Sequence, residues 1–236
     1  MFKAISFDLD ETLSDGSHFK AATAETSRLV ADRVADLSAT QVLEANGRAF
    51  TNQLDTTFAD WALGKITGRE LTFSIWQESF ASLGKADDEL TQFATEIHTD
   101  LAKKSYALFS DVLPVLSELK RMGVPIALVT NGSSDTQREK IDTLDLERHF
   151  DLIVVSAEHG YAKPNREIFS PVIDAFGVDP HEVWHVGDLM HMDVLGANNA
   201  GLHSVWLNRA NTEPTHAINP KFTITSLNEL LKNPGA

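Results

Sequence analysis

The sequence of 236 residues contains no cysteine. This absence excludes disulfide bonds, thiolate zinc sites and cysteine nucleophiles, and it fits a reducing compartment. The chain also lacks any apolar run close to the roughly 20 residues that a membrane-spanning helix needs. Its first residues lead directly into charged residues and a strand pattern, without the features of a secretory signal peptide. We therefore expect a cytoplasmic protein that has no membrane partner.

Basic residues are scarce as well: 20 Lys plus Arg stand against 34 Asp plus Glu, which gives a formal net charge of −14. Such a surface repels a nucleic acid polymer, and no Lys/Arg cluster offsets the repulsion. A small anionic substrate remains compatible with this charge if a metal ion, a lysine or backbone N–H groups compensate it locally. The sequence has no Walker A pattern, dinucleotide glycine pattern or GxSxG motif, and its histidines do not have zinc-ligand spacing.

The stretch that organises the chain is residues 2–13, FKAISFDLDETL. Its short apolar run predicts a buried β-strand that stops at Asp8 and Asp10. Carboxylates are costly at the end of a buried strand unless they are hydrated or face an opposite charge. Two carboxylates that converge in a turn favour a cation between them. A polar turn alone would also explain the pair, so the choice depends on the rest of the chain.

From about residue 19 to residue 106 the sequence has helical periodicity and almost no strand pattern. Apolar stripes with spacings of three and four residues predict four helices, which suit a small bundle. The stripes are Leu29, Val30, Val34 and Leu37; Phe50, Leu54, Phe58 and Trp61; Leu71, Ile75, Trp76 and Phe80; and Leu90, Phe93, Ile97 and Leu101.

From about residue 111 strands and helices alternate with short connections. Strands are predicted at VPIALV, DLIVVS, EVWHV and HSVWL and around residues 222–224, with a last helix over residues 227–231. This alternation predicts an α/β fold with a Rossmann-like, doubly wound parallel sheet covered on both faces. We expect a core domain of residues 1–14 and 108–236, with a helical cap domain of residues 15–107 inserted after the first strand.

Polar residues recur where the predicted strands end. Asp8, Thr130 and Asp188 each follow a strand, and Lys163 lies in the loop after the intervening strand. Parallel strands end at one edge of the sheet, which is where ligands bind. A turn leading into a helix would return Asp193 to the same place. Clustered carboxylates favour a hard cation, and Mg²⁺ is the usual one.

These segments resemble the four ordered motifs of the haloacid dehalogenase (HAD) superfamily. The resemblance is carried by DLDET from Asp8, the strand that ends in Thr130-Asn131-Gly132, the pair Lys163-Pro164, and Gly187-Asp188 followed by Asp193. Each motif is weak alone, but four in the right order are specific. The helical insertion is similar to the C1 cap of that superfamily, so the resemblance covers the whole chain.

The resemblance implies a phosphoryl-transfer mechanism. Asp8 would attack phosphorus and form an aspartyl-phosphate, and Asp10 would act as general acid and then as general base. Mg²⁺ would be held by the Asp8 carboxylate, the Asp10 backbone carbonyl and Asp188. Asp193 would be a further ligand, directly or through water, or would orient Lys163.

The resemblance also implies a phosphate-binding set. Thr130 and Lys163 would contact the non-bridging phosphoryl oxygens and stabilise their charge in the transition state. Asn131 would lie in the loop beside the phosphate and contribute to substrate binding.

Several reactions occur within this superfamily. Phosphatases and phosphomutases carry an aspartate two residues after the nucleophile, as this chain does at Asp10, whereas 2-haloacid dehalogenases lack it. A released halide needs no proton, so a general acid would have no role there. We therefore expect a Mg²⁺-dependent phosphomonoester hydrolase, with a dehalogenase or a phosphomutase as the alternatives.

A non-catalytic protein is a further alternative. Receiver-type regulatory domains combine an acid cluster, a hydroxyl, a lysine and Mg²⁺ on a doubly wound sheet. They lack a helical insertion after the first strand and a second aspartate placed to hydrolyse the intermediate, so both features favour an enzyme.

The segments TNGSSDTQREKID and EHGYAKPNREIF are similar to the branch that contains the N-acylneuraminate-9-phosphatases and the pyrimidine 5'-nucleotidases. The resemblance implies a small phosphorylated substrate, a sugar phosphate or a nucleotide. It concerns the core sequence, whereas the cap selects the substrate. We expect a monomer or a homodimer.

Overall fold

The computed structural model describes residues 2–214 and 217–232, and its largest element is a six-stranded sheet in the order β3-β2-β1-β4-β5-β6. Every neighbouring pair of strands is parallel. The strands are β1 (Ala4–Phe7), β2 (Ile126–Thr130), β3 (Leu152–Val155), β4 (Val183–Gly187), β5 (His203–Leu207) and β6 (Phe222–Ile224). The predicted parallel sheet is therefore confirmed.

Alternate residues of the central strands pack on opposite faces of the sheet. In β1, Ile5 and Phe7 belong to one hydrophobic cluster and Ala4 to the other. In β2, Leu128 and Val129 divide in the same way. Because both faces are buried, the strands read as nearly continuous apolar runs in the sequence.

Helices cover both faces of the sheet, as a doubly wound fold requires. The first cluster is completed by α5 (Val112–Arg121), α6 (Ser134–Thr143) and the 3₁₀-helix η5 (Leu227–Lys232). The second is completed by η2 (Arg166–Phe169), α8 (Ser170–Phe176) and α9 (Leu195–Asn199). Shorter elements connect them: η1 (Glu147–His149), α7 (Ser156–His159), η3 (Pro180–Glu182) and η4 (Met190–Val194).

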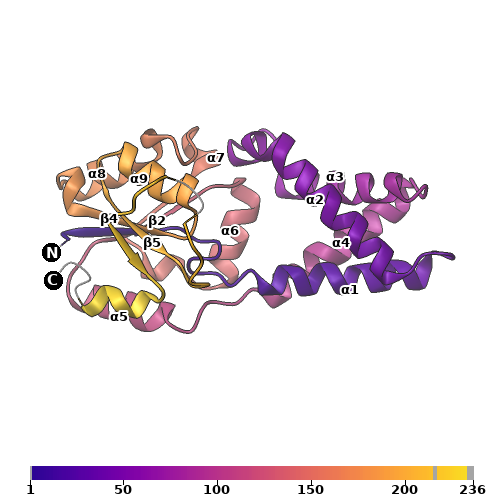
Figure 1. Ribbon diagram of the computed structural model, residues 1–236, viewed down its shortest axis with the longest axis horizontal. Coiled ribbons are helices and arrows are strands. Elements are labelled where there is room, and N and C mark those ends of the chain that lie inside the picture. The colour runs from indigo at the N-terminus through magenta and orange to yellow at the C-terminus, as the bar shows by residue number, and fades with distance from the viewer. Residues whose placement is uncertain (1, 215–216, 233–236) are drawn as a thin grey trace.

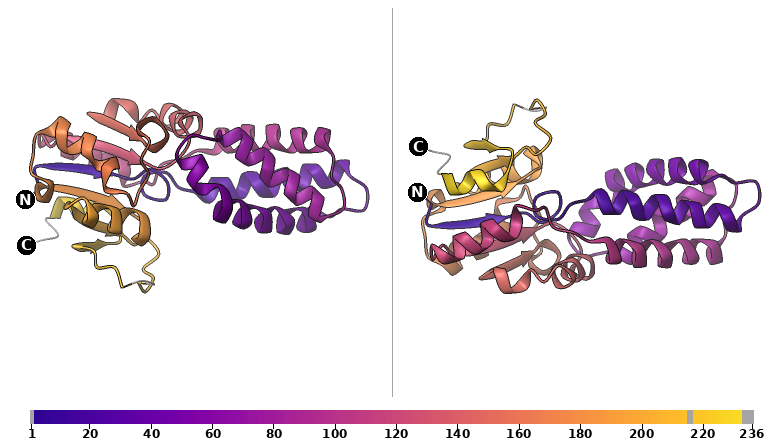
Figure 2. Two further views of the ribbon diagram at one scale, coloured as in Figure 1. Left: turned by 90° about the horizontal axis from the view of Figure 1, so that it is seen from above. Right: turned by 90° about the horizontal axis from the view of Figure 1, so that it is seen from below.

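Four helices are inserted between β1 and α5, and they form a bundle at one end of the elongated molecule (Figure 1, Figure 2). Their bounds are α1 (Ser17–Arg33), α2 (Ala39–Ala62), α3 (Gly68–Ser82) and α4 (Asp88–Ser105). Ser38 and Thr67 start α2 and α3 with capping boxes, in which the cap hydroxyl and a side chain three residues later satisfy each other's backbone N–H groups. The predicted four-helix insertion is thus present.

The bundle has hydrophobic clusters of its own. One is centred on Trp76 and Phe80, and a smaller one on Leu71 and Ile75. The division into a core of residues 1–14 and 108–236 and a cap of residues 15–107 stays a prediction, and part of that core region lies outside the described residues.

Three local features differ from the sequence prediction. The short helix α7 follows β3 without an apolar pattern that would indicate it. Between β3 and β4, where only an alternation of strands and helices was predicted, the 3₁₀-helix η2 is followed directly by α8, which has Pro171 in its first turn. The last helix is a 3₁₀-helix.

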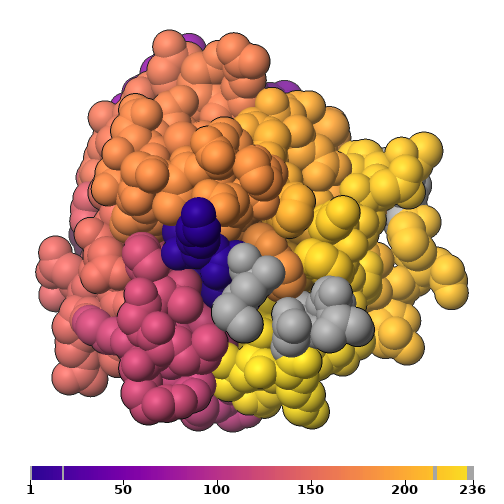
Figure 3. Space-filling view, turned by 90° about the vertical axis from the view of Figure 1, so that its left-hand side faces the viewer, coloured from indigo at the N-terminus to yellow at the C-terminus, as the bar shows by residue number. Residues whose placement is uncertain are grey.

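Strand β1 begins at the face opposite the helical bundle. Figure 3 shows the indigo start of the chain at the middle of that face, surrounded by magenta, orange and yellow segments from later in the sequence. All strands run in the same direction, so their carboxyl ends point toward the bundle (Figure 1). Among the described residues, no helix is both long and apolar enough to cross a membrane.

Candidate active site

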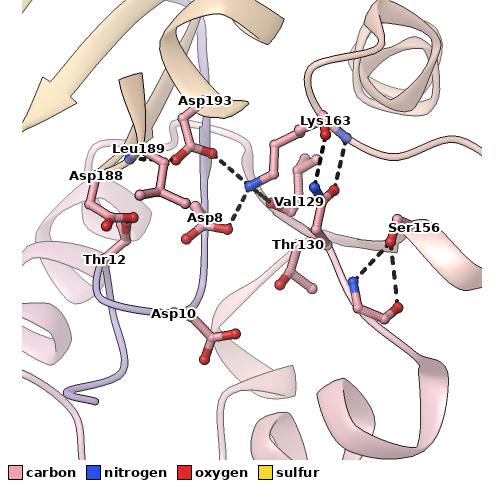
Figure 4. Close-up of polar contacts among 12 residues, drawn as sticks. Asp8, Asp10, Thr12, Val129, Thr130, Ser156, Lys163, Asp188, Leu189 and Asp193 are labelled. Atoms are coloured by element: carbon pink, nitrogen blue, oxygen red, sulfur yellow. Dashed lines mark hydrogen bonds and ion pairs between the residues drawn. The ribbon is translucent and has the colours of Figure 1, made fainter. Parts of the chain in front are cut away.

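The predicted site residues meet at the carboxyl edge of the sheet (Figure 4). Asp8 directly follows β1, Thr130 ends β2 and Asp188 directly follows β4, so the parallel topology alone brings these three together. Lys163 comes from the loop between α7 and η2, and Asp193 from η4.

Lys163 is the centre of the site. Its side chain is almost completely buried, and its ammonium group donates to Asp8 Oδ1 at 2.5 Å, to Asp193 Oδ1 at 2.7 Å and to the carbonyl of Val129 at 3.0 Å. Burial alone would lower the pKa of Lys163, but the two carboxylates raise it well above the ordinary value. All three of its N–H donors are therefore engaged by acceptors of the protein.

Asp193 is fixed by the π-helical turn η4, which returns it to the strand ends. Its Oδ2 accepts from the backbone N–H of Leu189 at 2.9 Å, and its Oδ1 lies 3.3 Å from His185 Nε2. Gly187 makes room for it, since a Cβ at that glycine would lie 2.2 Å from the Asp193 carboxyl carbon. Burial would raise the pKa of Asp193, but Lys163 and His185 hold it well below the usual range. This geometry fits the predicted alternative in which Asp193 orients Lys163.

Asp8, Asp188 and Asp193 form a cluster in which one carboxylate oxygen of each lies within 4.8 Å of the others. Burial, followed by repulsion from neighbouring carboxylates, raises the pKa of Asp8 to about 7 and that of Asp188 to about 8. Three carboxylates thus face the single ammonium of Lys163. This donor set fits a hard divalent cation with oxygen ligands, such as Mg²⁺.

The Asp10 side chain lies apart from this cluster. Its carboxylate is turned away from that of Asp8 (Figure 4) and accepts from Lys140 Nζ at 2.8 and 2.9 Å and from Gln137 Nε2 at 3.1 Å. Burial would raise the pKa of Asp10, but Lys140 and Gln137 lower it below the usual value. The predicted metal contact of Asp10 through its backbone carbonyl stays a prediction.

The two predicted substrate-binding residues of the β2 loop differ in their surroundings. Thr130 Oγ1 accepts from Gln137 Nε2 at 2.6 Å and is buried at the strand end. The side chain of Asn131, in contrast, pairs with the backbone of Lys163: Nδ2 donates to its carbonyl at 2.9 Å and Oδ1 accepts its N–H at 2.8 Å. Asn131 therefore fixes the loop that carries Lys163, and its predicted role in substrate binding stays a prediction.

Four residues of the site were not predicted from the sequence: Gln137, Lys140, Ser156 and His185. Gln137 and Lys140 lie three residues apart on α6, which places them on one helix face. Ser156 Oγ accepts from the N–H of Gly132 at 2.9 Å and donates to the carbonyl of Ala62 in the helical insertion. The only sequence indication of Gln137 and Lys140 was their place in the segment TNGSSDTQREKID.

Comparison with known proteins identifies the family. The family described as haloacid dehalogenase-like hydrolase matches residues 2–201. This covers most of the chain and all four motifs, so the protein belongs to the haloacid dehalogenase-like hydrolases. The resemblance to this family is confirmed.

Three similar proteins with curated names are two phosphatases and a nucleotidase. The chain is 33% identical over 156 residues to phosphoserine phosphatase of Thermus thermophilus, covering 66% of this chain and 62% of that protein. It is 34% identical over 178 residues to the pyrimidine 5'-nucleotidase YjjG of Escherichia coli, covering 73% and 75%. It is 35% identical over 161 residues to N-acylneuraminate-9-phosphatase of Rattus norvegicus, covering 66% and 64%. The predicted similarity to the last two groups is confirmed.

Solved structures agree on the fold. YfnB from Bacillus subtilis, in a crystal structure bound to magnesium, superposes with a TM-score of 0.76 at 24% identity and covers 100% of this chain and 99% of that one. The L-2-haloacid dehalogenase of Xanthobacter autotrophicus has a TM-score of 0.71 at 21% identity, with 98% of both chains covered. At these identities the likeness establishes the fold of the chain and not its reaction.

Proposed function

We propose that this hydrolase is a Mg²⁺-dependent phosphatase that acts on a small phosphorylated metabolite, a sugar phosphate or a nucleotide, through an aspartyl-phosphate. The observation that carries the proposal is the environment of Asp8. Its buried carboxylate contacts Lys163 and lies within the cluster formed with Asp188 and Asp193, while a second aspartate, Asp10, follows two residues later. Two of the relatives compared with the chain are named as phosphatases and one as a pyrimidine 5'-nucleotidase, and all three names describe removal of phosphate from a small metabolite.

The reaction would proceed in two displacements. A carboxylate oxygen of Asp8 attacks phosphorus, and the bond from phosphorus to the ester oxygen breaks. As general acid, Asp10 would give a proton to the leaving oxygen, which departs as an alcohol. For this step its carboxylate has to leave Lys140 and take up a proton from solvent when the substrate binds. A water molecule then attacks the aspartyl-phosphate while Asp10 takes up its proton, and inorganic phosphate leaves with the Asp8 carboxylate restored.

Asp8, Asp188 and the backbone carbonyl of Asp10 would hold Mg²⁺, with Asp193 placed to fix Lys163. When bound, the ion would reduce the repulsion between the Asp8 carboxylate and an anionic substrate. Thr130 and Lys163 would bind the non-bridging oxygens. For this, Lys163 has to exchange one of its three present acceptors for a phosphoryl oxygen.

The resemblance to dehalogenases in fold makes haloacid hydrolysis the second candidate. Asp10 argues against it, because that reaction releases a halide that needs no proton. A phosphomutase would share the chemistry of Asp8 and Asp10 and would differ in the group that accepts the phosphoryl. A regulatory phospho-acceptor is disfavoured by the family and by the helical insertion.

The test is phosphate release from a panel of sugar phosphates, nucleotides and p-nitrophenyl phosphate, with Mg²⁺ and with EDTA. We expect turnover only with Mg²⁺, and a loss of at least about a thousandfold in Asp8→Asn because the nucleophile is removed. As a matched control, Asp151→Asn changes an aspartate that accepts from the backbone N–H of Ile126, at the opposite end of β2 from Thr130. That variant should keep its activity if it folds. No release from any substrate by folded, Mg²⁺-loaded protein would refute the proposal and direct the search to haloacids and mutase substrates.

A further inference from the structure

The amide of Gln137 connects the two polar groups that the proposed reaction needs besides Asp8. Its Nε2 donates to Thr130 Oγ1 at 2.6 Å and to Asp10 Oδ2 at 3.1 Å. The residue is fully buried, although glutamine is a residue type that is usually exposed. Its side chain packs on Gly132, where a Cβ would lie 2.8 Å from Gln137 Cγ. A buried amide in so tight a place is held in one orientation.

Lys140 decides which end of that amide faces the site. Its Nζ donates to Gln137 Oε1 at 3.0 Å, and an ammonium group has no acceptor. The oxygen of the amide must therefore face Lys140, and the nitrogen must face Asp10 and Thr130. The bidentate contact of Lys140 with the Asp10 carboxylate keeps the ammonium in position.

The consequence falls on the hydroxyl of Thr130. Because Gln137 Nε2–H occupies a lone pair of Oγ1, the hydroxyl hydrogen has to point elsewhere. Across residues 2–214 and 217–232 no protein acceptor takes it. Thr130 lies at the end of β2, beside Asp8 and Lys163 (Figure 4). The hydrogen is therefore available to an oxygen of a phosphoryl group bound there.

We propose that Gln137 is a positioning residue that orients the Thr130 hydroxyl as a donor to the phosphoryl group, and that Lys140 fixes the Gln137 amide for this role. The inference rests on the proposed function in that it assumes a phosphoryl group at this site. It assigns a role to two residues of α6, a helix that lies outside the four motifs. Gln137 itself need not touch the substrate.

The test measures the affinity for inorganic phosphate by titration calorimetry, with Mg²⁺ present, so that no turnover is needed. We expect Gln137→Met to weaken phosphate binding by about tenfold or more. Without the Gln137 amide, the Thr130 hydroxyl is no longer held as a donor, and its hydrogen bond to the charged phosphate is weakened or lost. Gln137→Glu has almost the same shape but accepts the Thr130 hydrogen, so it should weaken binding at least as much. Arg138→Met, next on the same helix, removes an exposed ion pair with Glu158 and should leave the affinity unchanged.

A double-mutant cycle separates positioning from a general loss of structure. Thr130→Val removes the hydroxyl, so adding Gln137→Met to it should have almost no further effect on phosphate affinity. If Gln137→Met does not fold, Lys140→Met provides the same test from the more exposed residue, and Lys140→Arg should restore the affinity. Equal phosphate affinity in wild type and Gln137→Met, or additive losses in the cycle, would overturn the inference.

The outcomes for the inference and for the proposed function can be told apart. If the wild type binds phosphate but hydrolyses no ester, the proposed function fails, whereas the affinities of the variants still decide the role of Gln137. If the wild type binds neither phosphate nor orthovanadate, both are refuted.

Discussion

The charges around Lys163 do not balance within the protein. Asp8, Asp188 and Asp193 lie close together in a buried site, and the ammonium contacts only Asp8 and Asp193. Asp188 is left with a weak contact of 3.5 Å to Thr12 Oγ1. Burial and mutual repulsion therefore raise the pKa values of Asp8 and Asp188, so these two groups hold protons that a divalent cation would displace.

Such a displacement would make the proposed Mg²⁺ binding dependent on pH. In the unfolded chain the two carboxyls titrate near pH 4, whereas in the folded, metal-free protein their pKa values are about 7 and about 8. Between these values the unfolded chain has released protons that the folded protein keeps, so the contribution of Asp8 and Asp188 to stability falls as pH rises from about 4 to about 8. Mg²⁺ needs both groups ionised, so its stabilising effect should grow over the same range.

We expect the melting temperature to rise when EDTA is replaced by Mg²⁺, by a small amount at about pH 6 and by the largest amount at about pH 8.5. Below its pKa, each ligand carboxyl lowers the affinity for Mg²⁺ by about tenfold per pH unit, because its proton has to be displaced. Differential scanning fluorimetry measures it. Asp188→Asn should abolish most of the rise at the higher pH, and Asp151→Asn should not. A rise of the same size at both pH values would show that the two carboxyls are not the groups that Mg²⁺ deprotonates.

Asp193 provides a second test at the scale of one residue. Its carboxylate accepts from Lys163, from His185 and from the N–H of Leu189. Asparagine has the same volume but only one acceptor oxygen. In Asp193→Asn one of the buried donors around this side chain, either Lys163 or the N–H of Leu189, therefore faces the amide NH₂ group and loses its acceptor. We expect a loss of about 3 kcal/mol in the free energy of unfolding.

Urea unfolding in EDTA at neutral pH measures this loss without a contribution from metal binding. Glu167→Gln, which removes an exposed ion pair with Arg166, is the control and should not change the midpoint measurably. A loss below about 1 kcal/mol in Asp193→Asn would mean that the contacts of its carboxylate are not a buried charge network of this kind.

At the scale of elements, the sequence predicted the strands and their ends well. The strands are short apolar runs bounded by polar residues, and a parallel sheet places all their carboxyl ends at one edge. Asp8, Thr130 and Asp188 could therefore be placed together without knowledge of side-chain contacts. The return of Asp193 through a turn was also expected, although not that this turn is a π-helix.

The supporting residues could not be predicted in this way. His185 reaches Asp193 from inside β4, and its contact with Ser6 depends on the register that pairs the two residues across neighbouring strands. Gln137 and Lys140 depend on how α6 is rotated about its axis, which a mostly polar helix does not reveal. The motif suggested substrate binding for Asn131 but gave no indication that its amide pairs with the backbone of Lys163.

The contact between the helical insertion and the sheet domain depends on glycines. Gly68 begins α3, and its N–H donates to the carboxylate of Asp135 in α6 at 3.1 and 3.2 Å. A Cβ there would lie 1.8 Å from Thr136 Oγ1 and 3.1 Å from Thr136 Cβ. Gly64, in the same connection, has room for no Cβ either, because Ala157 Cβ is 2.9 Å from that position. The two parts approach closely only because these side chains are absent.

We predict that Gly68→Ala weakens this contact although alanine favours the helix itself. The new methyl group should lower the free energy of unfolding by about 1–3 kcal/mol, because it clashes with Thr136 of α6. The higher helix propensity of alanine should return less than about 1 kcal/mol. Thermal unfolding measures the net loss, and X-ray scattering should show an increased radius of gyration. Gly47→Ala, inside α2, should be neutral or stabilising, because a Cβ there would meet nothing within 4 Å except the backbone of its own helix and its chain neighbours. Thr136→Ala should partly reverse the destabilisation by Gly68→Ala. Without such a reversal, the clash between the new methyl group and Thr136 is not its cause.

At the scale of the whole molecule, the two chain segments that connect the helical bundle to the sheet domain run side by side. Ser14 and Leu108 form an antiparallel bridge, and Phe109 N–H donates to the carbonyl of Leu13 at 3.0 Å. The chain therefore leaves the sheet domain and returns to it at almost the same place. The main hydrophobic clusters on the two faces of the sheet contain no residue from α1 to α4. The bundle and the sheet region thus have separate hydrophobic clusters, which supports the predicted division into two domains.

This arrangement leads to a prediction about a shortened chain in which residues 16–106 are replaced by a short glycine-containing turn. Ser14 and Leu108 already form an antiparallel bridge. A short turn can therefore connect the two segments as it does in a β-hairpin. We expect the shortened chain to unfold cooperatively and to keep the increase in melting temperature with Mg²⁺, since Asp8, Asp188 and Lys163 all belong to the sheet domain.

The shortened chain should still hydrolyse p-nitrophenyl phosphate slowly, but discriminate less among sugar phosphates and nucleotides, because the bundle faces the carboxyl ends of the strands (Figure 1). Asp8→Asn in the shortened chain is the control for residual turnover. A shortened chain without a cooperative transition would show that the sheet domain depends on the bundle for its stability, and the predicted boundaries at residues 14 and 108 would then be wrong.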